Sequence, residues 1–208
     1  MRVLLVNGSP REAGCTCTAL GFVAEELEAQ GIETKIFQLG TDPIEGCRAC
    51  NVCFKQGSCI IDDIVNEFAE EAKTADGFVF GSPVHFASAG GKITSFMDRL
   101  FYSTTRGRPF SGKPAAALVS CRRGGSTAAL DQLYKYLAYS HTPIVSGQYW
   151  NMIHGNTPDE VRQDLEGVQI MRTIGRNMAW LLQCIKAGKD AGIEFPKPER
   201  TTYTNFIR

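Results

Sequence analysis

Short apolar runs alternate along the chain with longer stretches in which apolar residues recur every three or four positions. The short runs have the length and the flanking turn residues of strands that are buried on both faces. They predict five strands, at residues 3–6, 33–39, 77–80, 115–119 and 143–145. The periodic stretches predict helices near residues 20–27, 61–72, 92–101 and 130–137. A last, long helix is expected from Pro158, with Thr157 as its cap, to about Ile185.

Strands that alternate with helices predict a parallel sheet covered on both faces. Five strands and about five helices favour an α/β fold of the flavodoxin-like type, a three-layer, doubly wound sheet in the strand order 2-1-3-4-5. We expect one domain over residues 1–192, with a cysteine-rich insertion at 44–60 and a tail at 193–208. In this strand order the first, third and fourth strands are neighbours, so the loops that follow them should meet at one edge of the sheet.

The loop after the first strand, residues 7–18, joins a buried strand to a helix. Its small residues allow backbone N–H groups to close around an anion, and the helix N-terminus adds a favourable partial charge. The hydroxyl groups of Ser9, Thr16 and Thr18 are further donors, and Arg11 offsets negative charge. The loop therefore predicts a phosphate site. The alternative is an ordinary strand–helix turn capped by Thr16.

Other phosphate-binding motifs fail on spacing. The sequence contains no G-x-G-x-x-G, the dinucleotide fingerprint. Residues 107–113 imitate the start of a P-loop, but Pro114 stands where Ser or Thr is required, and the segment enters a strand. No cysteine is followed six positions later by an arginine, as a phosphatase loop of similar topology would need. A loop for a phosphate monoester such as FMN fits best.

The loops after the third and fourth strands supply the groups that a flavin ring needs. Residues 81–91 mix glycine, hydroxyl, apolar and aromatic groups, which suit the faces and the polar edge of an isoalloxazine. Backbone N–H groups of residues 120–125 can complete that edge. His85 is either a packing residue or, through its pKa, a direct participant in the chemistry. Arg122 and Arg123 are either solvated or placed for a nicotinamide phosphate.

Four of the eight cysteines are clustered, in the pattern Cys47-x2-Cys50-x2-Cys53-x5-Cys59. In a reducing compartment such a cluster indicates metal ligands or thiols rather than disulfides. Successive x2 spacings bring three thiolates around one small object, as in ferredoxin-type runs, which favours a [4Fe–4S] cluster. Zinc, which usually takes two separated C-x2-C pairs, and metal-free thiols or a disulfide are the alternatives.

Composition and charge narrow the class of protein further. Hydrophobic residues make up 43% and charged residues 21% of the chain, as in ordinary globular proteins. The 22 basic and 22 acidic residues cancel, so we expect neither a nucleic-acid nor a membrane partner. No apolar run approaches the length of a bilayer span, and the N-terminus lacks the features of a signal peptide. We expect a cytoplasmic protein.

Taken together, these segments resemble the flavodoxin-like NAD(P)H-dependent FMN reductase superfamily, particularly its iron–sulfur flavoprotein branch. The resemblance spans about residues 1–185. The segments that match the family pattern are residues 8–11 and 14–16, the cysteine block, residues 81–86 and Gly124-Gly125. It implies FMN as cofactor, with the phosphate bound by Ser9, Arg11, Gly14, Cys15 and Thr16. The residues implied around the flavin ring are Ser82, Pro83, Val84, His85, Phe86, Ser88, Ser120, Cys121 and Gly124. In the iron–sulfur branch, Cys47, Cys50, Cys53 and Cys59 would hold a [4Fe–4S] cluster that exchanges electrons with FMN.

Two positions depart from the family pattern. Cys15 stands where Asn commonly precedes the Thr of the phosphate loop, and His85 stands where Tyr is frequent. Members commonly form dimers or tetramers, and the segment 148–153, with Tyr149 and Trp150, suits either such an interface or the core.

We therefore expect an FMN-dependent oxidoreductase that couples FMN to a [4Fe–4S] cluster. Its chemistry would be carried by the flavin, without a catalytic side chain. NAD(P)H, a redox partner protein or a small-molecule acceptor would exchange electrons with it. One alternative is a cluster-free NAD(P)H-dependent FMN or quinone reductase. The other is a non-enzymatic flavodoxin-type carrier or a zinc-binding protein.

Overall fold

The computed structural model describes residues 1–199, 202 and 204, so part of the expected tail at 193–208 lies outside the described residues. The strands are β1 (Arg2–Asn7), β2 (Glu33–Gln38), β3 (Gly77–His85), β4 (Ser88–Ala89), β5 (Ala115–Cys121) and β6 (Met152–His154). The helices are α1 (Cys15–Glu28), α2 (Cys53–Gln56), α3 (Ile64–Thr74), α4 (Gly91–Ser103), α5 (Ser126–Tyr139), α6 (Pro158–Gln163) and α7 (Leu165–Asp190).

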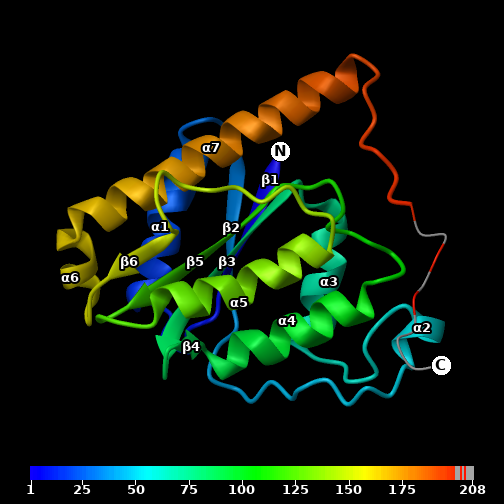
Figure 1. The fold of residues 1–208 in the computed structure, drawn as a ribbon, viewed down its shortest axis with the longest axis horizontal. Coiled ribbons are helices and arrows are strands. Elements are labelled where there is room, and N and C mark those ends of the chain that lie inside the picture. Colours follow the sequence, from blue (N-terminus) through cyan, green and yellow to red (C-terminus); the bar gives the residue numbers. More distant parts are fainter. Residues whose placement is uncertain (200–201, 203, 205–208) are drawn as a thin grey trace.

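Five of the strands form a parallel sheet in the order β2-β1-β3-β5-β6, and the short β4 pairs antiparallel with β3 (Figure 1). Counted along the chain without β4, this is the predicted order 2-1-3-4-5. The predicted flavodoxin-like α/β class is confirmed. The carboxyl ends of β1, β3 and β5 consequently lie side by side, at the place where such sheets bind ligands.

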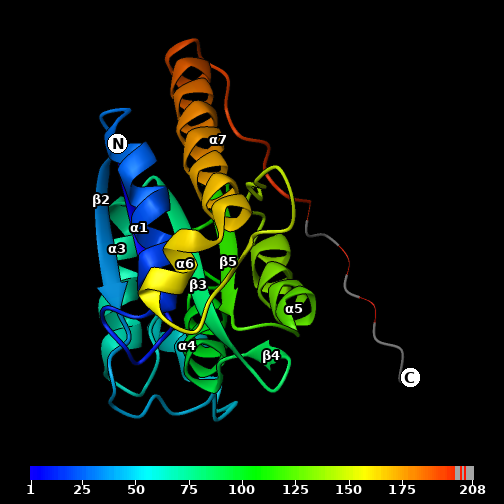
Figure 2. The ribbon, with the colours of Figure 1, turned by 90° about the vertical axis from the view of Figure 1, so that its left-hand side faces the viewer.

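Helices cover both faces of the sheet (Figure 2), and alternate residues of each central strand enter opposite layers. In β1, Val3 and Leu5 pack with α1, α6 and α7, whereas Leu4 and Val6 pack with α3, α4 and α5. The same alternation runs through β3 and β5. Since neither face of these strands reaches water, they appear in the sequence as continuous apolar runs.

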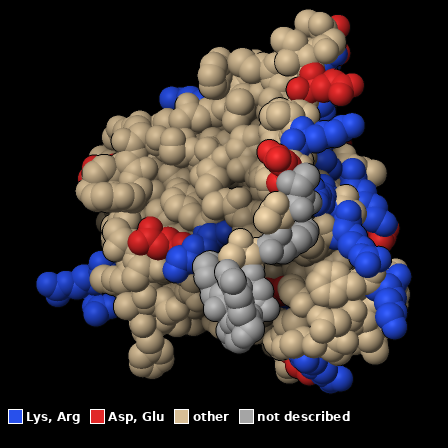
Figure 3. All heavy atoms as spheres, turned by 45° about the vertical axis from the view of Figure 1, so that its right-hand side comes forward, with Lys and Arg blue, Asp and Glu red and all other residues tan. Residues whose placement is uncertain are grey.

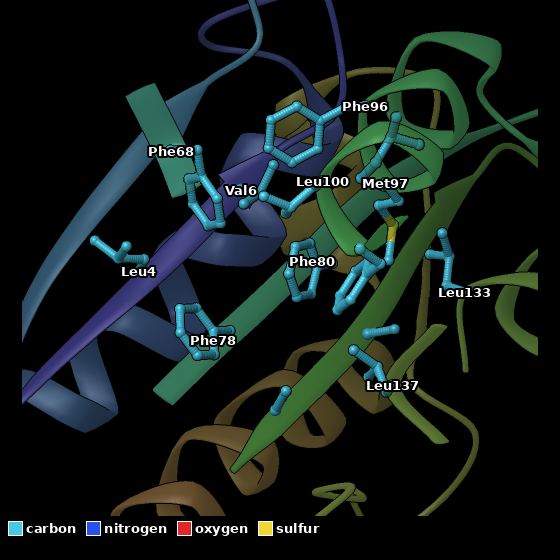
Figure 4. Packing of buried hydrophobic residues seen from close by; sticks show 14 of the residues in the cluster. Leu4, Val6, Phe68, Phe78, Phe80, Phe96, Met97, Leu100, Leu133 and Leu137 are labelled. Carbon is cyan, nitrogen blue, oxygen red and sulfur yellow. The ribbon is translucent and has the colours of Figure 1, made fainter. Parts of the chain in front are cut away.

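Aromatic side chains dominate the layer that holds α3, α4 and α5 (Figure 4). Phe68 of α3 meets Phe96 of α4 edge to face, with ring centroids 5.4 Å apart. Phe68 also contacts Phe78 and Phe80 of β3, whose side chains are fully buried. This packing fixes α4 against the sheet and so determines where the polar side of α4 points.

The predicted fifth strand at 143–145 is wrong, because β6 at Met152–His154 takes the edge position beside β5. Ile144 forms only a single bridge, with Ala115. Between these segments the chain leaves the sheet, and the fully buried Asn151 replaces the missing backbone pairs. Its amide donates to the carbonyl oxygen atoms of Ala117 and Val145 at 3.0 and 3.4 Å.

The predicted single helix from Pro158 to about Ile185 is also wrong, since it is divided into α6 and α7 at Asp164. Thr157 caps α6 as expected, accepting a hydrogen bond from the backbone N–H of Glu160. Asp164 has a non-helical ψ of 79° and caps α7 through its carboxylate, which accepts from the N–H of Gly167. That carboxylate also accepts from the N–H of His154, which ties the break to the end of β6.

The third strand is longer than expected. Instead of ending at Phe80, β3 continues to His85, and the chain then returns through β4. Phe86 and Ala87 make the turn with φ values of 50° and 59°. Two successive residues with positive φ are typical of a tight β-hairpin turn. The segment predicted as a loop around the flavin ring therefore includes a β-hairpin.

Charges of the two signs are unevenly distributed over the surface. On the face drawn in Figure 3, Lys and Arg side chains gather along one edge, while most of the remaining face carries neither sign. Among the helices that the structure describes, none combines the length and the apolar character needed to cross a membrane.

Candidate functional site

A cleft of about 270 Å³ opens at the carboxyl ends of β1, β3, β5 and β6. This volume is close to the lower end of the usual range for ligand pockets, roughly 300 Å³ upward. The residues that line it are Ser9, Pro10, Arg11, Cys15, Thr16, Pro83, Val84, His85, Ser120, Cys121, Arg122, Gly155 and Asn156. Four separate strand ends thus contribute to one site, as the topology requires of a ligand cleft in such a sheet.

The loop after β1 is held in shape by the fully buried Asn7. Its side-chain amide donates to the backbone oxygen of Arg11 at 3.2 Å and to Oε1 of Gln38 at 2.6 Å. Its side-chain oxygen accepts from the N–H of Ser9 at 3.1 Å. Gln38 in turn donates to the backbone oxygen of Ser9 at 2.9 Å. The loop is therefore preformed rather than dependent on a ligand for its conformation.

The N-terminus of α1 points into this cleft through Cys15 and Thr16. Its N-cap is Gly14, which has no side chain to accept from the first backbone N–H groups. These N–H groups and the partial positive charge of the helix end are suited to an anion. Thr16 lies inside α1, so the alternative in which it caps an ordinary strand–helix turn is wrong.

Thr16 also connects the first loop to the strand end after β5. Its hydroxyl oxygen lies 2.8 Å from that of Ser120, and both side chains are buried. Gly81 of β3 makes room for this arrangement, because a Cβ atom there would lie 2.9 Å from Cγ2 of Thr16. The floor of the cleft is thus closed by contacts among β1, β3 and β5.

The hairpin of β3 and β4 forms one wall of the cleft. Inside it, the hydroxyl group of Ser82 accepts from the N–H of Gly90 at 3.0 Å. Ser88 donates to Oε1 of Gln132 at 2.8 Å, which fastens the hairpin to α5. Gly125, with a φ of 90°, packs against the hairpin turn, since a Cβ atom there would lie 2.7 Å from Cβ of Ala87. These contacts position Pro83, Val84 and His85 at the cleft.

Nine of the fourteen residues implied for FMN line the cleft: Ser9, Arg11, Cys15, Thr16, Pro83, Val84, His85, Ser120 and Cys121. The other five are placed nearby. Gly14 caps α1, Ser82 and Ser88 brace the hairpin, the exposed Phe86 forms its tip, and Gly124 lies in the loop before α5. Their contact with FMN stays a prediction.

Sequence reasoning missed Pro10, Gly155 and Asn156, and gave Arg122 no place in the flavin site. Gly155 and Asn156 follow β6, whose position was predicted incorrectly. The signal that would have found them is the His-Gly-Asn sequence directly after a short apolar run. Small and amide residues of this kind are frequent where a strand end meets a ligand.

Burial disfavours the thiolate form of the two cysteines in the cleft. Burial raises the pKa of Cys15, and burial likewise raises the pKa of Cys121 despite hydrogen bonding that involves Ser126. Since a thiolate is the reactive form of cysteine, neither side chain is activated as a nucleophile. The cleft is therefore organised for binding rather than for cysteine chemistry.

The four clustered cysteines meet at a second cavity, between the segment before α3 and the side of α4. Cys47, Cys50, Cys53 and Cys59 all line it. The other lining residues are Arg48, Asn51, Ile60, Ile61, Arg99, Tyr102 and Ser103. Burial raises the pKa of Cys53, and the neighbouring thiols add to this rise. The four thiols thus line one space, and their role as metal ligands stays a prediction.

The backbone of the cysteine segment adopts unusual conformations. Ala49 and Asn51 have φ values of 50° and 59°, and Gly57 has a φ of 83°. Left-handed conformations at residues other than glycine cost about 1–3 kcal/mol each and tend to occur at functional sites. They fall between the successive cysteines, where the chain must turn to keep each thiol on the same cavity.

Four thiols are the groups through which this cavity could bind a metal. Among the described residues, no group of three or more His, Cys, Asp or Glu side chains is arranged to hold a single metal ion. A zinc ion needs sulfur atoms at about 2.3 Å from one centre. An iron–sulfur cube instead takes one thiolate on each of its irons, so its four ligands are spread over a wider space. The thiols of Cys47, Cys50, Cys53 and Cys59 are the ligand type that such a cube takes, and the cluster itself stays a prediction.

Comparison with known proteins identifies the family of this chain. The model of a family described as NADPH-dependent FMN reductase matches residues 1–157, most of the chain. The chain belongs to this family. It is accordingly an FMN-dependent flavoprotein oxidoreductase, and the cleft at the sheet edge lies within the matched segment.

Two curated relatives cover nearly the whole chain. An iron–sulfur flavoprotein of Methanocaldococcus jannaschii is 29% identical over an alignment of 195 residues, and the match covers 89% of this chain and 100% of the relative. An iron–sulfur flavoprotein of Methanosarcina thermophila is 24% identical over 192 residues, 91% of this chain and 100% of the relative. The resemblance to the iron–sulfur flavoprotein branch is confirmed.

Among solved structures, a flavodoxin from the domain Archaea superposes with a TM-score of 0.58 at 14% identity. The match covers 88% of this chain and 99% of the flavodoxin. It shows the shared fold.

Proposed function

We propose that this protein transfers electrons between FMN in the sheet-edge cleft and a [4Fe–4S] cluster held by Cys47, Cys50, Cys53 and Cys59. The observation that carries the proposal is that all four thiols line one cavity. The names of the two curated relatives support the same assignment. Bound FMN would supply the exchange between one-electron and two-electron chemistry.

The residues of the cleft would bind and orient FMN. The uncapped N-terminus of α1 and the side chain of Arg11 receive the phosphate, because both offer positive charge next to the preformed loop. Pro83 and Val84, on the hairpin wall, give apolar contact to the ring. Ser120 and the backbone after β5 offer hydrogen bonds to its polar edge. No side chain is required as an acid or a base.

The exchange of electrons with other molecules is also part of the proposal. NAD(P)H, a redox partner protein or a small-molecule acceptor would serve as donor or acceptor. We further propose a homo-oligomer, dimer or tetramer. Tyr149 and Trp150 are about half exposed and form an edge-to-face pair 4.4 Å apart, whereas Met152 and Ile153 belong to the core. A loss of oligomer in Trp150→Ser, measured by light scattering, would assign this pair to the interface.

A charge reversal at Arg11 tests the FMN site. Arg11 is exposed and lines the cleft, so Arg11→Glu should fold normally and weaken FMN binding about tenfold or more, equivalent to about 1.4 kcal/mol. Binding of riboflavin, which lacks the phosphate, should change much less. Arg123→Glu is the matched control, because Arg123 is exposed and does not line the cleft. Equal effects on FMN and riboflavin would refute the phosphate assignment.

Anaerobic purification tests the cluster. The proposal expects about four irons per chain and a broad absorption near 400 nm that bleaches with dithionite. Rapid reduction of FMN by NADPH in iron-free protein would instead support a cluster-free reductase. Bound zinc without iron would support the zinc alternative.

A further inference from the structure

Arg99 of α4 is a positively charged side chain in the interior of the protein. It is 2% exposed and is the largest of the fully buried side chains. Burial of a guanidinium group costs several kcal/mol unless other groups compensate it, and an apolar residue of similar size is often as stable or more so. The fold alone therefore gives little reason for an arginine at this position.

Every N–H group of Arg99 has a partner. The two terminal nitrogen atoms donate to Asp63 at 2.6 and 2.9 Å. They also donate to the backbone oxygen atoms of Glu45 and Ile61 at 3.5 and 2.8 Å. The remaining donor, Nε, points at Sγ of Cys59 at 3.3 Å. These bonds use all five donors of the guanidinium group and fix its orientation.

The partners of Arg99 bracket the cysteine segment. Glu45 lies two positions before Cys47, whereas Ile61 and Asp63 follow Cys59 and lead into α3. Asp63 is itself the N-cap of α3, accepting from the N–H of Val65. One side chain from α4 thus connects both ends of the segment that carries the four thiols.

We propose that Arg99 is a positioning residue that holds Cys59 in place and raises the midpoint potential of the iron–sulfur centre. This inference rests on the proposed function of the cysteine cavity. Hydrogen bonds to the ligand sulfur atoms are among the factors that set the potential of such centres. A donor with a permanent positive charge stabilises the reduced centre more than the oxidised one, because reduction adds negative charge. Asp63 lies beyond the guanidinium group and offsets part of this effect.

Arg48 provides a contrast within the same cavity. It also lines the space between the cysteines, but its side chain is 59% exposed and pairs with Glu45. A solvated charge is screened and acts weakly on its surroundings. The two arginines thus differ in burial and in contact with sulfur, while their charge is the same.

The test is a redox titration of the full-length protein with its flavin and iron, followed by electron paramagnetic resonance of the reduced centre. In Arg99→Met the ratio of reduced to oxidised centre at a fixed potential should fall about tenfold or more, a negative shift of about 59 mV. Arg48→Met, the matched control, should shift the potential much less, because the Arg48 side chain is largely exposed. Asp63→Asn should shift it in the positive direction, since asparagine can still cap α3 but carries no charge.

The outcomes separate this inference from the proposed function. Iron-free wild-type protein would overturn both. Wild-type protein with about four irons and equal potentials in the two Arg→Met variants would overturn the role of Arg99 alone. If Arg99→Met does not retain iron, Asp63→Asn decides: a positive shift supports the proposal, and an unchanged potential overturns it.

Discussion

The hydroxyl oxygen atoms of Thr16 and Ser120 lie 2.8 Å apart, although the two residues are separated by 104 positions in the chain. Thr16 belongs to the first turn of α1, and Ser120 stands near the end of β5. Both line the cleft that we assign to FMN. Their contact links the part of the cleft that would hold the phosphate to the part that would hold the ring.

Thr16→Glu should abolish FMN binding. Thr16 is buried, with 1% of its surface exposed, and it lines the cleft. The longer glutamate side chain would therefore place its carboxylate where the phosphate is expected. Fluorescence titration with FMN measures the loss. Thr16→Ser keeps the hydroxyl group and serves as the control, and thermal unfolding of both variants reports on the fold. Undiminished flavin content in Thr16→Glu would discard the phosphate assignment.

Gly125→Ala should weaken FMN binding and lower stability, whereas Gly124→Ala should leave the stability unchanged. Gly125 has a φ of 90°, and an added Cβ atom would meet Ala87 in the hairpin turn. The strain should reduce the free energy of unfolding by about 1–3 kcal/mol and displace the wall of the cleft. At Gly124 an added Cβ atom has nothing within 4 Å. Urea unfolding and FMN titration of the two variants test the difference, which should vanish if the hairpin does not depend on this contact.

Asn7→Ala should cost about 1–3 kcal/mol of unfolding free energy, because it leaves buried groups of Ser9 and Gln38 without their partner. The loop after β1 would lose its preformed shape, so FMN affinity should fall as well. Asn177→Ala is the comparison, since Asn177 makes a single side-chain bond, to the backbone oxygen of Ser146. Equal stability losses in urea unfolding would show that Asn7 does not organise the loop.

The sheet and its central strands were predictable from the sequence because a strand that is buried on both faces consists of consecutive apolar residues. Val3 to Val6 and Ala115 to Val119 are continuous apolar runs for this reason. The cysteine cavity was predictable for a similar reason. Its four cysteines are close in the sequence, so their spacing alone predicts that their thiols face one space.

Features that depend on distant contacts could not be predicted in this way. Asn151 replaces strand pairing only because Ala117 lies beside it, 34 positions away in the chain. Asp164 interrupts a helical pattern by bonding to His154 across the end of β6. From the sequence, Arg99 is expected to be solvated on the polar face of an amphipathic helix. In the structure it pairs with Asp63, which lies 36 positions earlier in the chain. In each case one polar side chain determines the local structure. The spacing of apolar residues along the chain does not indicate which distant group that side chain will bind.

Cys50→Ser should remove the iron–sulfur centre and leave FMN binding intact. Cys50 lines the cysteine cavity, and a serine hydroxyl group is a poor substitute for a soft thiolate ligand. The FMN cleft is built by other residues, so its affinity should not change. Cys184→Ser is the matched control, because Cys184 is also an exposed free cysteine but lies on α7 and does not line the cavity.

Iron analysis, absorption near 400 nm and FMN titration of these two serine variants should therefore separate the two centres. The expected pattern is loss of iron in Cys50→Ser alone, with equal FMN affinity in both proteins. Equal iron content in the two variants would exclude Cys50 as a ligand. A parallel loss of FMN would instead mean that the cysteine segment supports the flavin cleft, which the separate sets of lining residues argue against.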